Sequence, residues 1–184
     1  MKTALLLIDI QNDYFEGGTM TLVGALEASE NAALLLERFK KQNLPVIHIQ
    51  HIATKPGATF FLPDTVGAEI HKNVQPEINE KVIVKHFPNS FRETELLSYL
   101  NANDISDLVI GGMMTHMCID ATTRAAKDLG YSCTLIGDAC ATRNLEIHGE
   151  KVQAADVHNA FLAALNSTYA SVINTHDYLA QLEI

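Results

Sequence analysis

The chain has 184 residues, of which 47% are hydrophobic and 19% are charged, a composition typical of a globular domain rather than a disordered or fibrous chain. Its formal net charge of -9 at pH 7 disfavours a nucleic-acid partner, because a phosphate backbone calls for a basic face. No stretch approaches the ~20 apolar residues that a membrane helix needs. We therefore expect one domain, 1–184, with a small-molecule partner, no nucleic acid and no membrane.

The start of the chain resembles a signal peptide for only a few residues. Its apolar run at 4–8 is interrupted by Asp9, and no small-residue cleavage site follows. Three cysteines without repeated spacing do not make a disulfide framework and are typical of a reducing compartment. The expected location is the cytoplasm.

Short β-rich runs alternate with helical patterns along the chain. Strands are predicted at 3–9, 45–50, 81–87, 107–114, 132–138 and 169–174. Helices are predicted at 25–43, 92–104, 116–129, 147–166 and 175–182, and Gly130 ends the third of them. Residues 51–80, which contain three prolines and two glycines, are predicted to form a long loop with one short helix.

This alternation predicts an α/β fold with a parallel sheet and right-handed crossovers. The first strand, "TALLLID", is apolar throughout, as expected when helices cover both faces of a sheet. Ligands of such sheets bind beyond the carboxyl ends of the strands. The candidate functional residues are therefore the polar residues at the strand ends: Asp9, Gln50, His51, Lys85, His86, Asp138 and the turn 112–118.

Cys118 lies in "GGMMTHMCIDATTRAA" (111–126), where a predicted strand turns into a helix. A sulfur in the first turn of a helix lies near unpaired amides and the positive end of the dipole, which lowers a thiol pKa and favours the thiolate. The same amides can stabilise an oxyanion beside the sulfur. The motif alone fits a nucleophile and a buried structural thiol about equally well.

A zinc site is the third interpretation of this segment. Zinc needs about four N, S or O ligands, or three and a water. His116 and Cys118 are two residues apart on a helix, so their side chains point roughly 200° from one another. The other cysteines, Cys133 and Cys140, stand alone and are interpreted as structural. We therefore expect no metal and no cofactor.

Asp9 and Lys85 each end an apolar strand. Taken alone, a carboxylate at this place is more typical of a turn, and a lysine more often extends into solvent. Together with Cys118 they form a coherent set, in which the carboxylate takes the thiol proton and the ammonium stabilises both anions.

The segments "LLLIDIQNDYF", "KHFPNSF" and "GGMMTHMCIDATTRAA", followed by "GDACAT", resemble those of the isochorismatase-like cysteine hydrolases. The resemblance covers nearly the whole chain and implies a three-layer α/β/α Rossmann-like fold whose six-stranded parallel sheet has the order 3-2-1-4-5-6. It implies a catalytic triad of Asp9, Lys85 and Cys118. It also implies a cis peptide bond between Met113 and Met114, and an oxyanion hole made by the N–H groups of Met114 and Cys118.

The resemblance leaves three functions to compare. Members that hydrolyse a vinyl ether lack the cysteine, so its presence favours attack on an amide- or ester-like carbonyl. Nicotinamidase-like members carry an Asp-x-His metal pair after the second strand, where this chain has His51-Ile52-Ala53. The preferred hypothesis is a metal-independent hydrolase that cleaves a small amide or carbamoyl C–N bond through a thioester. The alternatives are vinyl ether hydrolysis by Asp9 without covalent catalysis, and a non-enzymatic small-molecule-binding or thiol-scavenging protein.

Aromatic and polar residues close to the triad in sequence are the candidates for the substrate pocket. Phe60 and Phe61, in the 51–80 loop, are interpreted as a lid or a subunit contact. His86 and His116 either orient the site through hydrogen bonds or only pack. The resemblance further implies a homo-oligomer, a dimer or a tetramer. The pocket candidates are Phe15, Gln50, Phe60, Phe61, Phe87, Asn89, Phe91 and Met117.

Overall fold

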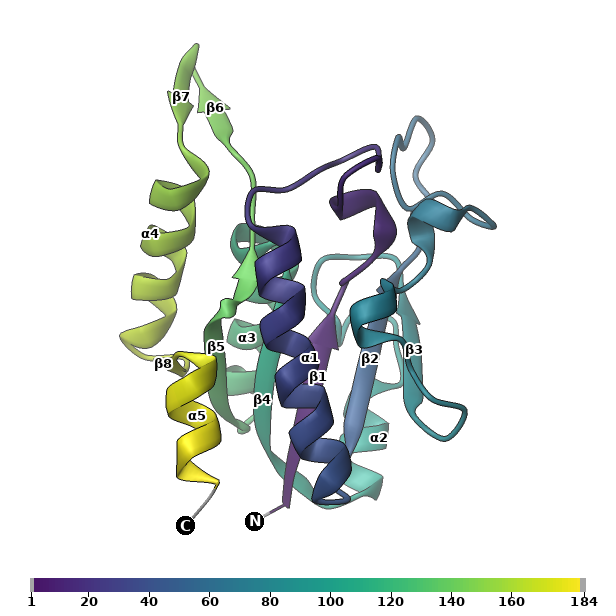
Figure 1. Cartoon of the computed structure of the whole chain (residues 1–184), viewed down its shortest axis with the longest axis vertical. Helices are drawn as coiled ribbons and strands as arrows, with labels where there is room; N and C mark the ends of the chain where they lie inside the picture. The colour runs from purple at the N-terminus through teal and green to yellow at the C-terminus, as the bar shows by residue number, and fades with distance from the viewer. Residues whose placement is uncertain (1, 183–184) are drawn as a thin grey trace.

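The computed structural model describes residues 2–182, and its centre is a six-stranded parallel sheet (Figure 1). The sheet strands are β1 (Lys2–Ile8), β2 (Val46–His51), β3 (Lys81–Lys85), β4 (Ile105–Met113), β5 (Ser132–Ala141) and β8 (Ser171–Ile173). Their order in the sheet is β3-β2-β1-β4-β5-β8. Because β8 is the sixth sheet strand along the chain, the predicted order 3-2-1-4-5-6 is confirmed.

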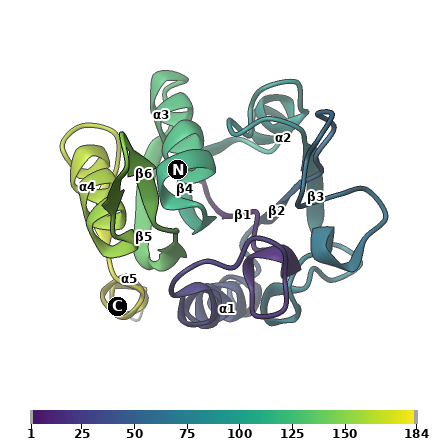
Figure 2. The same ribbon diagram turned by 90° about the horizontal axis from the view of Figure 1, so that it is seen from above.

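Helices cover both faces of the sheet and make three layers (Figure 2). One face carries α1 (Ala25–Lys41) and α5 (Thr175–Gln181), and the other carries α2 (Leu96–Ala102), α3 (Asp120–Asp128) and α4 (Ala154–Asn166). Strand β1 serves both cores, because Leu5 and Leu7 belong to the α1 side and Leu6 and Ile8 to the α2–α4 side. Burial on both faces is the reason why its sequence is continuously apolar.

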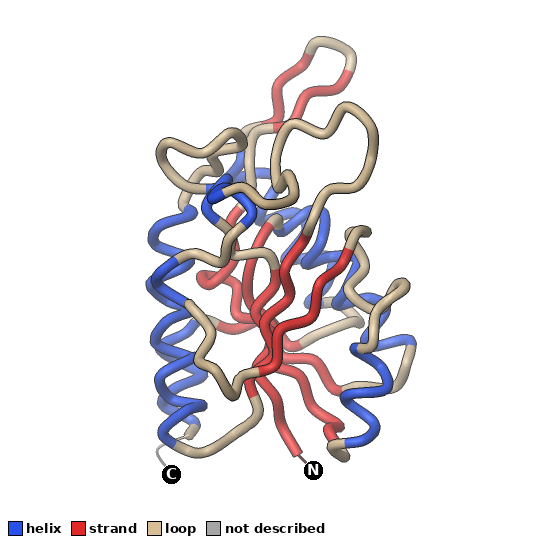
Figure 3. The backbone as a smooth tube through the Cα atoms, turned by 90° about the vertical axis from the view of Figure 1, so that its right-hand side faces the viewer, coloured by secondary structure: helices blue, strands red, loops and turns tan. Residues whose placement is uncertain are grey.

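The predicted start of the helix at 147–166 is wrong. Its first residues belong to an antiparallel hairpin, β6 (Leu145–Ile147) and β7 (Glu150–Val152), which projects beyond the carboxyl end of the sheet (Figure 3). The two residues between these strands, His148 and Gly149, have φ angles of 52° and 81°, as a type I′ turn requires. Their left-handed backbone ends any helical pattern at this point, and α4 begins only at Ala154.

The long loop and the segment before α3 add short helical turns. The 51–80 region contains two 3₁₀ turns, Val66–Ala68 and Lys72–Val74, rather than the single short helix predicted. The helix predicted at 116–129 begins as a π-helical turn, Thr115–Ile119, and continues as α3. None of the helices within residues 2–182 has both the length and the apolar composition needed to cross a lipid bilayer.

The pairing of β1 with β4, where the strand order reverses, places the two segments that carry the site. Asp9 directly follows β1, and the cis peptide bond Met113–Met114, as predicted, leads from β4 into the π-helical turn. The register sets Ile8 opposite Gly112, whose φ is 133°. A Cβ atom at this glycine would overlap the carbonyl oxygen of Ile8. Only glycine therefore allows the two strands to approach this closely.

We predict that Gly112→Ala lowers the free energy of unfolding by roughly 3 kcal/mol or more, because it combines a steric overlap with a disfavoured φ. Urea unfolding followed by circular dichroism measures the loss. Gly111→Ala is the matched control, since a Cβ there lies 3.3 Å from the Cβ of Ala139 and a small shift accommodates it. Equal losses in the two variants would contradict the close approach of the strands.

Candidate active site

Asp9, Lys85 and Cys118 come together at one edge of the sheet, although they are far apart in the sequence. Lys85 Nζ donates a hydrogen bond of 2.7 Å to Asp9 Oδ2, and both side chains are fully buried. The sulfur of Cys118, a carboxylate oxygen of Asp9 and a ring nitrogen of His51 all lie within 4.8 Å of one another. The three residues of the predicted triad thus share one buried cluster with His51. The sequence predicted no catalytic role for His51, which was considered only as a polar residue at a strand end and at the place of the absent Asp-x-His metal pair.

The Lys85 ammonium group lies at the centre of this cluster. In addition to Asp9, it lies 3.1 Å from His51 Nδ1 and donates to the carbonyl oxygens of Phe87 at 3.1 Å and Pro88 at 3.4 Å. Burial by itself lowers the pKa of Lys85, but Asp9 and Cys118 together outweigh this effect and hold the pKa above its ordinary value. Lys85 is therefore a fixed cation beside the sulfur.

The thiol of Cys118 is protonated in this environment, contrary to the expectation drawn from its place in a first helical turn. Burial raises its pKa, the charge of Asp9 raises it further, and Lys85 lowers it only in part. Desolvation of the sulfur, which no motif reveals, is the largest of these effects on the pKa. Among residues 2–182 the buried Asp9 Oδ1 has no hydrogen-bond partner, so this oxygen is free to accept a proton.

We predict that Asp9→Asn increases the rate at which iodoacetamide alkylates Cys118 at pH 7.5 by about tenfold, which is the effect of one unit of thiol pKa. The variant removes the negative charge that raises the thiol pKa and leaves Lys85 in place. Mass spectrometry of the Cys118 peptide measures the rate. Asp64→Asn, in the exposed loop, is the control and should leave the rate unchanged. A rate in Asp9→Asn equal to or below that of the wild type would contradict the assigned electrostatics.

Thr115 and His116 fix the π-helical turn that carries the cysteine. Thr115 Oγ1 lies 3.2 Å from the carbonyl oxygen of Ala141 and 2.8 Å from His158 Nδ1 of α4. His116 Nδ1 lies 2.6 Å from the hydroxyl of Thr142. Thr115 therefore contacts β5 and His116 contacts the residue that follows it, so both residues orient the turn through hydrogen bonds.

Phe60 and Phe61 lie on the side of the cluster where His51 is exposed. Phe60 lines a cavity of about 360 Å³ together with His51 and Pro88. Phe61 is buried, with its ring centroid 4.6 Å from that of Tyr14 and 5.9 Å from that of His51. The 51–80 loop forms most of the wall of this cavity, and two of its wall residues, His51 and Pro88, contact Lys85.

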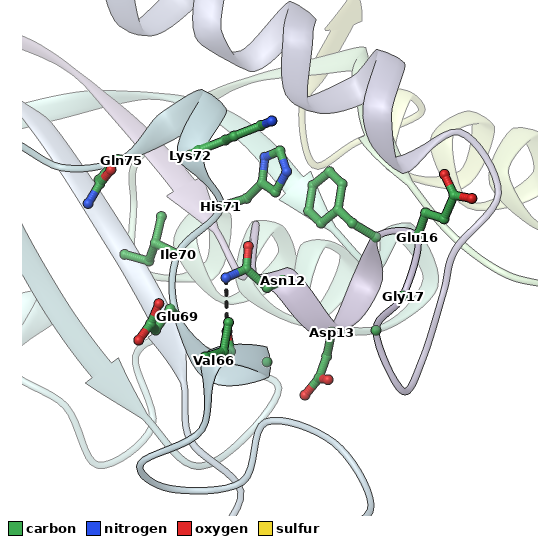
Figure 4. A pocket seen from close by; sticks show the side chains of 13 residues that line it. Asn12, Asp13, Glu16, Gly17, Val66, Glu69, Ile70, His71, Lys72 and Gln75 are labelled. Atoms are coloured by element: carbon green, nitrogen blue, oxygen red, sulfur yellow. Dashed lines mark hydrogen bonds between the residues drawn. The ribbon is translucent and has the colours of Figure 1, made fainter.

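Two other predicted pocket residues lie away from this cavity. Phe15 stacks on His71 with centroids 3.7 Å apart and lines a separate, wider hollow of about 600 Å³ (Figure 4). Phe91 packs on Tyr131, with centroids 6.1 Å apart, in the core on the α2–α4 side. Their rings are therefore part of the packing around the site rather than of the wall beside His51.

The remaining candidates have structural contacts of their own. Gln50 Nε2 donates to the carbonyl oxygen of Ala68, and Asn89 Oδ1 accepts from the backbone N–H of Phe91, as in an Asx turn. The Arg92 guanidinium covers the ring of Phe87 at 3.7 Å. Met117, in the π-helical turn, is 40% exposed, so its side chain is accessible from outside.

Gln11 and Asp13 position the site, and the sequence assigned neither of them a role. The buried Gln11 side chain donates to the carbonyl oxygen of His51 at 2.9 Å and accepts from its N–H at 2.7 Å. Asp13 Oδ2 accepts from the N–H of Phe61 at 2.6 Å. Both residues lie in the segment "DIQNDYF" after β1, which is one of the segments that carry the family resemblance, and both hold parts of the wall beside the triad.

The donor set of this cluster does not suit a zinc ion. Asp9, His51 and Cys118 each offer one ligand atom, but the Lys85 ammonium lies between two of them, 2.7 Å from Asp9 and 3.1 Å from His51. A divalent cation there would meet a fixed positive charge. Ala53, at the place of the histidine in the Asp-x-His pair, has no ligand atom in its side chain. The cluster fits an ammonium group instead.

Burial lowers the pKa of His51 to about 4; Asp9 opposes this effect and Lys85 adds to it. The imidazole is therefore neutral at pH 7. The unfolded chain takes up the proton near pH 6.5 and the folded chain only near pH 4. The unfolded state thus binds more protons between these values, and stability is lost as the pH falls from 6.5 towards 4, by up to about 3 kcal/mol for this one group.

We predict that His51→Gln reduces the stability lost between pH 7 and pH 4.5, because the neutral amide cannot be protonated in the unfolded chain. Urea unfolding at the two pH values measures the difference in the free energy of unfolding. His148→Gln, in the exposed hairpin turn, should keep the wild-type loss. A loss in His51→Gln as large as that of the wild type would show that His51 is not the buried neutral group described here.

Comparison with known proteins defines the class. Residues 3–177 match the model of the isochorismatase domain. The chain is 51% identical to the uncharacterised isochorismatase family protein YddQ of Bacillus subtilis, over 97% of this chain and 99% of that protein. A solved structure from Oleispira antarctica, described as an isochorismatase hydrolase, superposes with a TM-score of 0.94 and 51% identity over 97% of this chain and 96% of that one. The maleamate amidohydrolase of Pseudomonas putida is 26% identical over 98% of this chain and 87% of the enzyme.

This chain therefore belongs to the isochorismatase family. The family consists of hydrolases and includes amidases.

Proposed function

We propose that the protein is a metal-independent cysteine hydrolase that cleaves a small amide or carbamoyl C–N bond through a thioester. The observation that carries the proposal is the buried cluster of a thiol, a carboxylate and an ammonium group at the carboxyl edge of the sheet. A maleamate amidohydrolase among the relatives supports amide chemistry.

In the first half of the reaction Asp9 acts as the base. Its free carboxylate oxygen takes the proton of the Cys118 thiol, and the Lys85 ammonium stabilises the thiolate that forms. The thiolate attacks the substrate carbonyl carbon, and the π electrons of the carbonyl group move to its oxygen. Protonated Asp9 then gives its proton to the leaving nitrogen, the C–N bond breaks, and the acyl group remains on the sulfur as a thioester.

In the second half a water molecule replaces the amine. Asp9 takes one proton from the water, whose oxygen attacks the thioester carbonyl. The C–S bond breaks, the acid leaves, and the proton returns to the sulfur. The sum of the two halves is hydrolysis of one C–N bond by one water molecule.

The oxyanion of both tetrahedral intermediates needs two donors, which we assign to the N–H groups of Met114 and Cys118. Both residues are buried, at 6% and 4% exposure, and both belong to the short segment that leads from β4 into the π-helical turn. Donors fixed by a turn that Thr115 and His116 anchor stabilise the charge without reorganising during the reaction.

We predict that Cys118→Ala lowers kcat by at least 10³-fold on any amide or ureido substrate that the wild type hydrolyses, because the thioester can no longer form. Acid quenching during turnover, followed by mass spectrometry, should find the acyl group on the Cys118 peptide of the wild type. Cys133→Ala is the matched control, since this buried cysteine lies in β5, and it should keep the wild-type kcat. A substrate whose hydrolysis requires Asp9 and survives Cys118→Ala would instead support the vinyl ether reaction and contradict covalent catalysis.

A further inference from the structure

Helix α4 contacts the π-helical turn of Cys118 from outside the reacting cluster, and the proposed mechanism gives this contact no role. The Nδ1 atom of His158 lies 2.8 Å from the Thr115 hydroxyl. One turn further along α4, the ring centroid of Phe161 lies 6.0 Å from that of His116. Thr115 and His116 are the first two residues of the π-helical turn. Helix α4 therefore contacts the start of this turn through two side chains.

The Thr115 hydroxyl lies where the π-helical turn, α4 and β5 meet. Thr115 is fully buried, and its Oγ1 lies 3.2 Å from the carbonyl oxygen of Ala141 at the end of β5. A hydroxyl group is both a donor and an acceptor, so it completes a contact with the His158 ring in either tautomer. Without that ring, the orientation of the hydroxyl would depend on the longer of its two contacts alone.

His158 is itself fixed relative to β5. Burial lowers the pKa of His158, opposed by a backbone hydrogen bond with Gly137 of β5, so the ring is neutral at pH 7. The start of α4 is held as well, because the N–H of Ala154 donates to Asn144 Oδ1 at 2.8 Å across the base of the β6–β7 hairpin. The ring therefore offers a hydrogen bond at a defined place without adding a charge near the ion pair.

The two N–H groups that the proposed mechanism assigns to the oxyanion, those of Met114 and Cys118, lie on either side of Thr115 in the chain. The N–H groups of Met117 and Ile119 both donate to the carbonyl oxygen of Met114, so the turn is a hydrogen-bonded unit. A displacement of Thr115 would therefore move both oxyanion donors relative to a bound carbonyl group. Such donors act only at hydrogen-bond distance from the developing charge.

We propose that His158 is a positioning residue for the oxyanion hole: its contact with the Thr115 hydroxyl holds the turn where the backbone donors meet the substrate oxygen. This inference rests on the proposed function and adds to it a residue of α4 outside the reacting cluster. Attack of Cys118 on a carbonyl group needs the oxyanion donors, whereas attack on an alkyl iodide does not. Loss of the His158 contact should therefore slow acylation of Cys118 and leave its alkylation unchanged.

The test compares two reagents that react with the same sulfur. p-Nitrophenyl acetate acylates a thiolate through a tetrahedral oxyanion and releases p-nitrophenolate, and iodoacetamide alkylates it by direct displacement of iodide. Peptide mass spectrometry should find both adducts on Cys118 of the wild type. His158→Leu should lower the rate of acylation about tenfold or more, with the rate of alkylation within about twofold of the wild type. Asn159→Leu, at the neighbouring exposed position of α4, is the matched control and should change neither rate.

Further variants identify the hydrogen bond as the cause. His158→Gln, whose amide can still contact the hydroxyl, should keep the acylation rate within about threefold of the wild type. Thr115→Ser keeps the hydroxyl and should behave in the same way, whereas Thr115→Val should be at least as slow as His158→Leu. The double variant of Thr115→Val and His158→Leu should be no slower than Thr115→Val alone, because both substitutions remove the same contact. The two Thr115 variants decide the question if leucine at position 158 prevents folding.

Three results would overturn the positioning role. One is a wild-type acylation rate in His158→Leu, and another is an equal loss of acylation and alkylation, which would indicate general damage to the site. The third is additive effects of the two substitutions in the double variant. Failure of the proposed function gives a different pattern, since wild-type Cys118 would then be alkylated but not acylated, and the positioning role would be refuted with it.

Discussion

The ion pair between Asp9 and Lys85 is the constraint on which the rest of the site depends. Two opposite charges that are fully buried 2.7 Å apart must compensate each other, since removal of either partner leaves an uncompensated charge that costs several kcal/mol. The sheet order explains how they meet. Strand β2 separates β1 from β3, so Lys85 reaches across the end of β2, where His51 is its register partner. The neutral imidazole of His51 lies 3.1 Å from Lys85 Nζ and 3.9 Å from Asp9 Oδ2.

The state of the sulfur follows from that pair. The ion pair places a carboxylate and an ammonium group beside Cys118, and burial favours the neutral thiol over the thiolate. In the mechanism that we propose, the resting site therefore holds its nucleophile as the unreactive thiol. Activation then requires a proton transfer from the Cys118 sulfur to Asp9, whose reacting atoms lie within 4.8 Å of each other.

Much of the fold and part of the site could be predicted from the sequence. Apolar runs located the six sheet strands, because a strand buried on both faces is apolar along its length and is therefore distinct from a loop. The strand order came from a resemblance, since periodicity does not specify neighbours. Asp9 and Lys85 could be selected because each ends a predicted strand. The hairpin after β5 could not be predicted, because its few residues continue the helical pattern of α4.

The protonation of Cys118 depends on desolvation, which only the packed structure defines. The roles of Gln11 and Asp13 rest on hydrogen bonds to residues 40 and 48 positions away, and no local pattern contains such information.

Lys85 makes its contacts through an ammonium group that keeps its charge, and this has a consequence for the electrostatics of the whole reaction cycle that we propose. At rest the cluster holds one carboxylate, one ammonium and one neutral thiol, with a sum of zero. After proton transfer the acid is neutral and the sulfur negative, and the sum is again zero; it remains zero when the negative charge moves to the carbonyl oxygen and when the acyl group occupies the sulfur. One proton moves in each half of the cycle, while the total charge of the poorly solvated interior stays constant. The protein interior therefore never has to solvate a net ion. The free-energy cost of desolvating the charged groups arises once, during folding.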